Sequence, residues 1–206
     1  MNLLPWIQSY YIQNYLKSND KVIDIYTVDN PGWRIKINLC GIGYETKTFK
    51  ELSIDNGDDD WVFIKLKDDI FDGAGDKNKL FFMLSFFRDW CQNNLHDEIK
   101  YITNYDNDDL LYWIQKEWFC KLDFGWDGEE YHGVKIIAEP NGKWYVEIEL
   151  LDTYLEDKVF NCVNVNNGSD DWVSINVINN IFKGNGDKNK LVFIIEKFRE
   201  WAEQYK

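Results

Sequence analysis

The stretch Phe71-Asp72-Gly73-Ala74-Gly75-Asp76-Lys77-Asn78-Lys79-Leu80 recurs 111 residues later as Phe182-Lys183-Gly184-Asn185-Gly186-Asp187-Lys188-Asn189-Lys190-Leu191. The same offset pairs Asp59-Asp60-Trp61 with Asp170-Asp171-Trp172. Near the start of each copy, Trp6-Ile7-Gln8 matches Trp113-Ile114-Gln115 at an offset of 107. Several collinear matches at a nearly fixed spacing are the signature of an internal repeat. The chain is therefore a tandem duplication, and copy two carries four extra residues between its first helix and its first strand.

Hydrophobic periodicity predicts the same elements in both copies. Apolar residues at 80, 83, 84, 87 and 91 follow helical spacing, and so do their counterparts from 191 to 202. The segments from 3 to about 17 and from 110 to about 122 also have the character of helices. Between the helices, four segments of each copy alternate apolar and polar residues, beginning in copy one near Ile23, Trp33, Leu52 and Val62. Gly73-Ala74-Gly75 is interpreted as a turn, and Asp76 as part of the N-cap region of the helix that follows.

These elements define the α+β fold class. Each copy is predicted to be an α-β-β-β-β-α module, in which a four-stranded antiparallel meander carries two helices on one face. Residues 1–95 form copy one, residues 96–108 the linker, and residues 109–206 copy two. Because the linker is short and polar, we expect the two modules to pack against each other.

The chain carries a formal net charge of −13. This charge makes free DNA or RNA an unfavourable ligand, since phosphate binding needs a basic surface. It favours encounter with a basic partner, although solubility alone is the simpler explanation. No segment resembles a secretory signal or a membrane span, which predicts a cytoplasmic protein.

The residues that usually carry chemistry are not shared between the copies. Each of the four cysteines (Cys40, Cys91, Cys120 and Cys162) matches a different residue type in the other copy, and no Cys-x-x-Cys occurs. This predicts isolated reduced thiols rather than zinc ligands or disulfides. No motif gives His96 or His132 a nucleophile or an orienting partner. The acidic runs at 55–60 and 166–171 lack the glutamate that closes an EF-hand loop. The sequence therefore predicts no catalytic residue, no metal and no cofactor.

Two groups of aromatic and acidic residues are candidates for binding a partner. If the apolar residues of the fourth predicted strand face the helices, Trp61 and Trp172 point to the opposite face of the sheet. The first candidate group is Asp59, Asp60, Trp61, Asp170, Asp171 and Trp172. The second group lies in the insertion of copy two and consists of Trp126, Asp127, Glu129, Glu130 and Tyr131. The alternatives are burial of the tryptophans between the modules or under the long 40–50 loop, and a solvated loop for the second group.

Taken in order, these motifs resemble the immunity protein 53 family of bacterial polymorphic toxin systems. The resemblance includes the Trp-Ile-Gln helix, Asp29-Asn30-Pro31-Gly32-Trp33 before an alternating strand, and Asp59-Asp60-Trp61. It extends to Phe71-x-Gly73-x-Gly75-Asp76 before a helix that ends with Phe87-Arg88-x-Trp90. Members are usually a single module, and both halves of this chain resemble one. The copies have diverged, because only copy two keeps an acidic, Trp-containing segment at 125–131 and only copy one keeps the Asp-Asn-Pro-Gly-Trp order.

The resemblance implies a non-catalytic immunity protein that binds and neutralises a cognate bacterial toxin domain. The acidity favours a basic, nucleic-acid-targeting toxin, because an acidic inhibitor competes with the phosphates of the substrate. The expected partner is thus a protein, with no direct binding of nucleic acid or membrane, and a monomer with pseudo-twofold modules fits the duplication. A carbohydrate- or protein-binding module that uses exposed Trp/Asp sheet faces is the alternative function.

Overall fold

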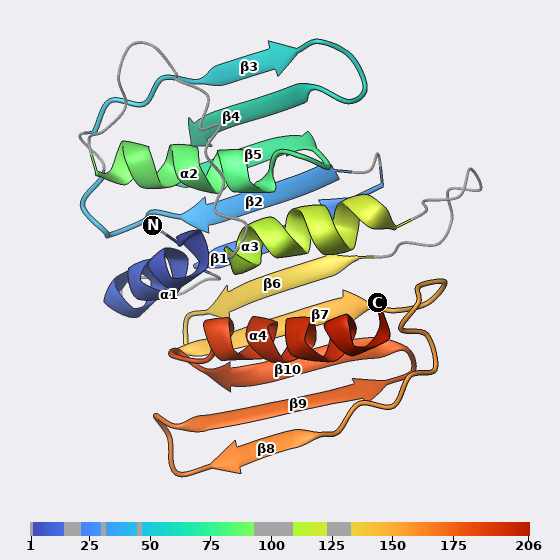
Figure 1. Cartoon of the computed structure of the whole chain (residues 1–206). Coiled ribbons are helices and arrows are strands. Elements are labelled where there is room, and N and C mark those ends of the chain that lie inside the picture. Colours follow the sequence, from blue (N-terminus) through green and yellow to red (C-terminus); the bar gives the residue numbers. More distant parts are fainter. Residues whose placement is uncertain (1, 15–21, 30–31, 45–46, 93–108, 123–132) are drawn as a thin grey trace.

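Ten β-strands form a single antiparallel sheet in the order β3-β4-β5-β2-β1-β6-β7-β10-β9-β8 (Figure 1). The computed structural model describes residues 2–14, 22–29, 32–44, 47–92, 109–122 and 133–206. Copy one supplies β1 (Ile23–Val28), β2 (Gly32–Asn38), β3 (Leu52–Asp55), β4 (Trp61–Lys67) and β5 (Ile70–Asp76). Copy two supplies β6 (Val134–Glu139), β7 (Lys143–Glu149), β8 (Val163–Asn166), β9 (Trp172–Ile178) and β10 (Ile181–Asp187).

The helices are α1 (Leu3–Asn14), α2 (Leu80–Cys91), α3 (Leu110–Trp113) and α4 (Leu191–Ala202). Helix α3 continues as a π-helical turn η2 (Ile114–Trp118) and a 3-10 turn η3 (Phe119–Lys121), and α4 ends in the 3-10 turn η4 (Glu203–Tyr205). The large antiparallel sheet, the helices and the repeated regions confirm the predicted α+β class and the duplication.

The four α-helices of the described residues lie on one face of the sheet (Figure 1). The strands alternate accordingly: Trp33, Ile35 and Ile37 of β2 are fully buried beneath the helices, whereas Arg34 and Lys36 point to the other side because successive side chains of a strand face opposite ways. We call the side without helices the open face. A single hydrophobic core runs beneath both copies on the covered side.

Each copy has five strands rather than the predicted four, and their order is not a meander. Residues 73–76 and 184–187, predicted as a turn and a helix cap, belong to β5 (Ile70–Asp76) and β10 (Ile181–Asp187). Strand β5 pairs with both β2 and β4, so it separates β2 from the β3–β4 hairpin that the predicted meander placed beside it. The turn from β4 to β5 is tight, and its residues Asp68 and Asp69 have φ values of 51° and 57°. Two-residue turns with positive φ match the twist of adjacent antiparallel strands, which explains how β5 follows β4 directly.

The glycines of β5 and β10 allow a helix to pass close to the sheet. A Cβ atom on Gly75 would lie 2.6 Å from Cβ of Lys79, and one on Gly184 would lie 2.3 Å from Cγ2 of Ile194. Glycine inside a strand often marks such a close approach, so the pattern that was interpreted as a turn is a strand under a helix. The N-cap prediction is also wrong, because Lys79 and Lys190 occupy the cap positions of α2 and α4.

The two copies are joined edge to edge through their first strands. Strand β1 pairs with β6 from Ile23↔Ala138 to Tyr26↔Lys135. One residue further on, Val134 N donates to the side chain of Thr27, at 3.1 Å from Oγ1. The modules therefore share one sheet and one core, while the proposed linker, residues 96–108, lies outside the described residues.

The first helix of each copy reaches onto the other copy. Gln8 of α1 accepts a hydrogen bond at Oε1 from the backbone N–H of Val192 in α4, at 3.1 Å. Gln115, at the matching position of copy two, accepts one from the backbone N–H of Phe81 in α2, at 2.8 Å. These two N–H groups lie in the first turn of a helix, where no partner exists within the helix itself. Each module thus caps the second helix of the other.

A single buried carboxylate serves the N-termini of both first helices. Asp109 accepts at Oδ1 from Leu111 N of α3 at 2.8 Å and at Oδ2 from Leu3 N of α1 at 2.7 Å. Its side chain has almost no solvent exposure. The matching residue of copy one is Asn2, which accepts from Leu4 N at 3.2 Å. The copies therefore meet not only along the strands but also where their first helices begin.

Candidate partner-binding surface

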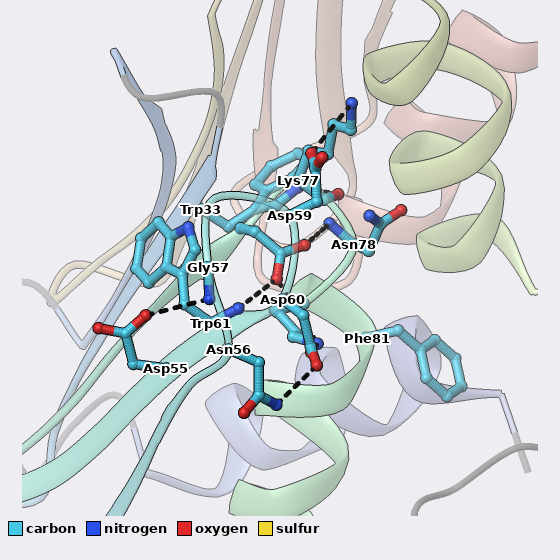
Figure 2. A network of polar contacts seen from close by, with 12 residues as sticks. Trp33, Asp55, Asn56, Gly57, Asp59, Asp60, Trp61, Lys77, Asn78 and Phe81 are labelled. Carbon is cyan, nitrogen blue, oxygen red and sulfur yellow. Dashed lines mark hydrogen bonds and ion pairs between the residues drawn. The ribbon is translucent and has the colours of Figure 1, made fainter.

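The tip of the β3–β4 hairpin is tied to the turn between β5 and α2. Asp60 Oδ1 accepts a hydrogen bond from Lys79 Nζ at 2.5 Å, and Asp59 Oδ1 lies 3.8 Å from Lys77 Nζ (Figure 2). Beneath them, the buried carboxylate of Asp76 accepts from the backbone N–H of Trp61 at 3.0 Å. Copy two repeats all three contacts with Asp171–Lys190 at 2.5 Å, Asp170–Lys188 at 2.7 Å and Asp187–Trp172 N at 2.8 Å. We call Asp59–Trp61 and Asp170–Trp172 the hairpin corners.

Lysine side chains favour the ionised form of Asp60, Asp170 and Asp171. Hydrogen bonds from Lys79, Lys188 and Lys190 lower the pKa of Asp60, Asp170 and Asp171, respectively. A lowered pKa stabilises the fold above the pKa of the unfolded carboxyl, and this contribution is lost as the pH falls through the folded pKa. The carboxylates are exposed to solvent, so the contribution is small. The predicted acidic corners are therefore ion-paired with their own module.

The corner tryptophans lie partly exposed on the open face, as their strand parity predicts. Trp61 packs against Phe63, with ring centroids 5.8 Å apart, and the Phe63 side chain is 42% exposed. In copy two the ring of Trp172 lies 5.9 Å from Lys143 Nζ, a cation–π arrangement. The two tryptophans therefore occupy equivalent positions with different neighbours. The other candidates, Trp126, Asp127, Glu129, Glu130 and Tyr131, lie outside the described residues.

The two copies differ far more on the open face than on the covered face. On the covered side, Trp33, Ile35 and Ile37 of β2 match Trp144, Val146 and Ile148 of β7. On the open side, Arg34, Lys36 and Asn38 of β2 match Tyr145, Glu147 and Glu149 of β7. The hairpin corners are an exception, since their tryptophans and their ion pairs are the same in both copies. The corners are thus part of the common scaffold, whereas the rest of the open face distinguishes one copy from the other.

Charged pairs of the open face are reversed between the copies. Lys36 faces Asp72 across β2 and β5, and the equivalent pair in copy two is Glu147 facing Lys183. Lys183 Nζ lies 3.3 Å from Glu147 Oε1. In copy one, Asp72 accepts two hydrogen bonds from Arg34, at 2.7 and 2.6 Å. Each copy keeps opposite charges together, but β2 presents the cation Lys36 where β7 presents the anion Glu147.

A hollow of about 420 Å³ opens on this face at the seam between the copies. Its charged and larger lining residues are Asp24, Tyr26, Lys135, Glu147, Glu149 and Ile181. Three of them are carboxylates and one is an ammonium, so the hollow is acidic. It lies where β1 and β6 cease to pair through their backbones, and it needs both copies for its walls. Sequence reasoning missed it because nothing in either copy alone indicates that β1 and β6 are neighbours.

The described residues contain no group of three or more His, Cys, Asp or Glu side chains that could hold a metal ion. The acidic run of copy one forms the β3–β4 turn, in which the Asn56 amide donates to Asp60 at 2.8 Å and Gly57 N donates to Asp55 at 3.3 Å. Both histidines, His96 and His132, lie outside the described residues.

The four thiols are expected to react at two different rates. Cys40 and Cys162 are exposed, whereas Cys91 and Cys120 are partly buried. Burial raises the pKa of the Cys91 thiol to about 11 and also raises that of Cys120. Because the thiolate is the reactive form, Cys91 and Cys120 should react with a disulfide reagent at pH 8 at least about tenfold more slowly than the exposed pair. Time-resolved absorbance with the Cys40→Ser, Cys162→Ser variant as the control measures this, and four equal rates would contradict it.

The fold and its surface define a class of protein: a duplicated α+β chain whose modules share one sheet and leave one face of it uncovered. The family described as Immunity protein 53 matches this chain twice, over residues 4–92 and 111–203. The chain therefore belongs to the Immunity protein 53 family, as two tandem copies. No curated protein and no solved structure matches it. None of the helices in the described parts of the chain is long and apolar enough to cross a membrane.

Proposed function

We propose that the chain is a non-catalytic, cytoplasmic immunity protein that binds and neutralises a cognate toxin domain. Membership of the Immunity protein 53 family carries this proposal. The net charge of −13 supports a basic partner, such as a toxin domain that acts on nucleic acid. An acidic inhibitor is steered towards such a domain and competes with the phosphates of its substrate.

The open face is the proposed contact surface, with the acidic hollow near its centre. Ten strands spaced about 4.8 Å apart make a face roughly 43 Å wide, and strands of this length extend about 20 Å. Such an area matches the about 800 Å² per partner of a stable protein interface. Two of the walls of the hollow, Glu147 and Glu149, belong to the copy-specific part of the face. A lysine or arginine of the toxin is the side chain whose charge complements Glu149, since Glu147 already lies 3.3 Å from Lys183 Nζ. The hairpin corners and residues 126, 127 and 129–131 are proposed as further contacts with the toxin.

Protection in cells tests the function itself. Co-expression of this chain with a candidate toxin domain from a neighbouring gene should restore growth, and the two proteins should purify together as a complex. Raising the ionic strength from about 0.05 to about 0.5 M shortens the Debye length about threefold. If the partner is basic, this screening should slow the association of the two proteins. A chain that neither binds this domain nor restores growth is not its immunity protein.

Charge reversal at the hollow tests the contact surface separately. Glu149→Arg places a cation in the hollow and should weaken binding of the toxin domain at least about tenfold, measured by calorimetry. Asn38→Arg is the comparison, because Asn38 is the equivalent residue of copy one on the same open face but does not line the hollow, so its effect measures a cation on that face outside the hollow. If wild type binds the toxin and Glu149→Arg binds it equally well, the function stands and the proposed surface is wrong.

A further inference from the structure

The contacts between the two copies are reciprocal. Gln8 caps α4 of copy two, and Gln115, its equivalent, caps α2 of copy one. The donors, Val192 and Phe81, are themselves equivalent residues at the offset of 111. The strand join follows the same rule, because β1 and β6 are the equivalent first strands and pair antiparallel with each other. A pseudo-twofold axis at the seam therefore relates the two copies to each other.

Aromatic contacts follow the same exchange. The ring of Tyr11 in α1 lies 4.6 Å from the ring of Trp144 in β7. From the other side, the ring of Phe119 in η3 lies 4.7 Å from the ring of Trp33 in β2. The Tyr11 hydroxyl also donates to the carbonyl of Glu139 at 2.5 Å. Both tryptophans are fully buried, so each first helix completes the core of the other module.

Reciprocal contacts through the same patch on both partners are what a twofold dimer interface contains. Two unrelated domains joined by a linker have no reason to exchange equivalent residues. A module alone would also lose the polar contacts that the other module supplies. Strand β1 would become an exposed edge strand. Phe81 N would lose its acceptor, the side-chain oxygen of Gln115, and Gln115 itself has no solvent exposure in the intact chain. An exposed strand edge and a core tryptophan that loses the ring covering it are costly, so the module is incomplete without a second one.

We infer that the seam is a dimer interface between modules, and that the covalent connection between the copies is dispensable for their association. The surface is formed by the first helix and the first strand of each module, and the partner that fits it is another module of the same kind. The chain is thus a dimer tied into one polypeptide. This inference concerns the association of the copies and does not depend on the identity of the toxin.

Cutting the folded chain between the copies tests the inference. A protease recognition sequence inserted within residues 96–108 allows the purified full chain to be cleaved under native conditions. The two halves should remain together as a one-to-one complex in gel filtration with light scattering. The midpoint of thermal unfolding should become dependent on protein concentration only after cleavage, because unfolding is then coupled to dissociation. Halves that separate at micromolar concentration, or that unfold once cut, would overturn the inference.

The glutamine caps provide a specific variant of this test. In the cut protein, Gln8→Ala combined with Gln115→Ala should raise the dissociation constant of the halves at least about tenfold, since two helix N–H groups lose their acceptors. Gln13→Ala is the matched control, because Gln13 is an exposed glutamine of the same helix α1, and it should change the constant less than about twofold. Equal effects of the double variant and of the control would show that the caps do not contribute to the seam.

Discussion

Replacement of Asp109 by alanine is expected to lower the free energy of unfolding by about 3 kcal/mol. The carboxylate caps α3 through Leu111 N and also accepts from Leu3 N of α1, so the variant removes an acceptor from two helix N-termini at once. Loss of one N-cap costs about 1 kcal/mol, and a donor left unpaired in a buried place adds about 1–3 kcal/mol. Its negative charge near the positive ends of two helices is lost as well. Urea unfolding followed by circular dichroism measures the change.

Asn2→Ala is the matched control for Asp109→Ala. Asn2 is the equivalent residue of copy one, is only half-buried and accepts from Leu4 N at 3.2 Å. Its replacement should cost about 1 kcal/mol or less, as expected for a single cap near the surface. If both variants lower the free energy of unfolding by the same amount, the shared cap at Asp109 stabilises the protein no more than a single helix cap does.

The sequence predicts well those parts of the fold that depend on local periodicity. The helices and the alternating strands of both copies follow from the spacing of apolar residues, and the duplication allows each to be checked against the other. Strand β5 was missed because Gly73 and Gly75 give it the composition of a turn. These glycines allow α2 to pack closely over the strand, and such a tertiary contact cannot be recognised in a local sequence pattern. The paired turn residues Asp68-Asp69 were the local signal that could have indicated the additional hairpin.

The sequence predicts the face on which the corner tryptophans lie, but not the ion pairs around them. Strand parity correctly placed Trp61 and Trp172 on the open face. The ion pairs of the hairpin corners could not be foreseen, because only the misread strand β5 brings Lys77 and Lys79 next to Asp59 and Asp60. The seam had one usable signal, namely a glutamine repeated in both copies within an apolar helix. A polar residue kept at such a position in two diverged copies needs a buried partner.

Gly184→Ala is expected to destabilise the protein by about 3 kcal/mol, near the upper end for overpacking a core. The added Cβ would lie 2.3 Å from Cγ2 of Ile194, on the helix that covers β10. Ile194 is fully buried, and its branched side chain has little rotamer freedom in a helix. The helix or the strand must therefore shift, which disturbs the packing around Phe182 and Phe198. Thermal and urea unfolding measure the loss of stability.

Gly73→Ala provides the comparison within the same chain, since Gly73 is the equivalent glycine of β5. There the added Cβ would lie 3.0 Å from Sδ of Met83, near the far end of an unbranched side chain. Methionine adapts to such a change by moving its flexible thioether, and alanine gains stability over glycine in a strand. We therefore expect Gly73→Ala to change the free energy of unfolding by about 1 kcal/mol or less. If both variants lose the same free energy of unfolding, the strand tolerates no side chain at this position, whichever residue covers it. The branching of Ile194 would then not be the cause of the destabilisation.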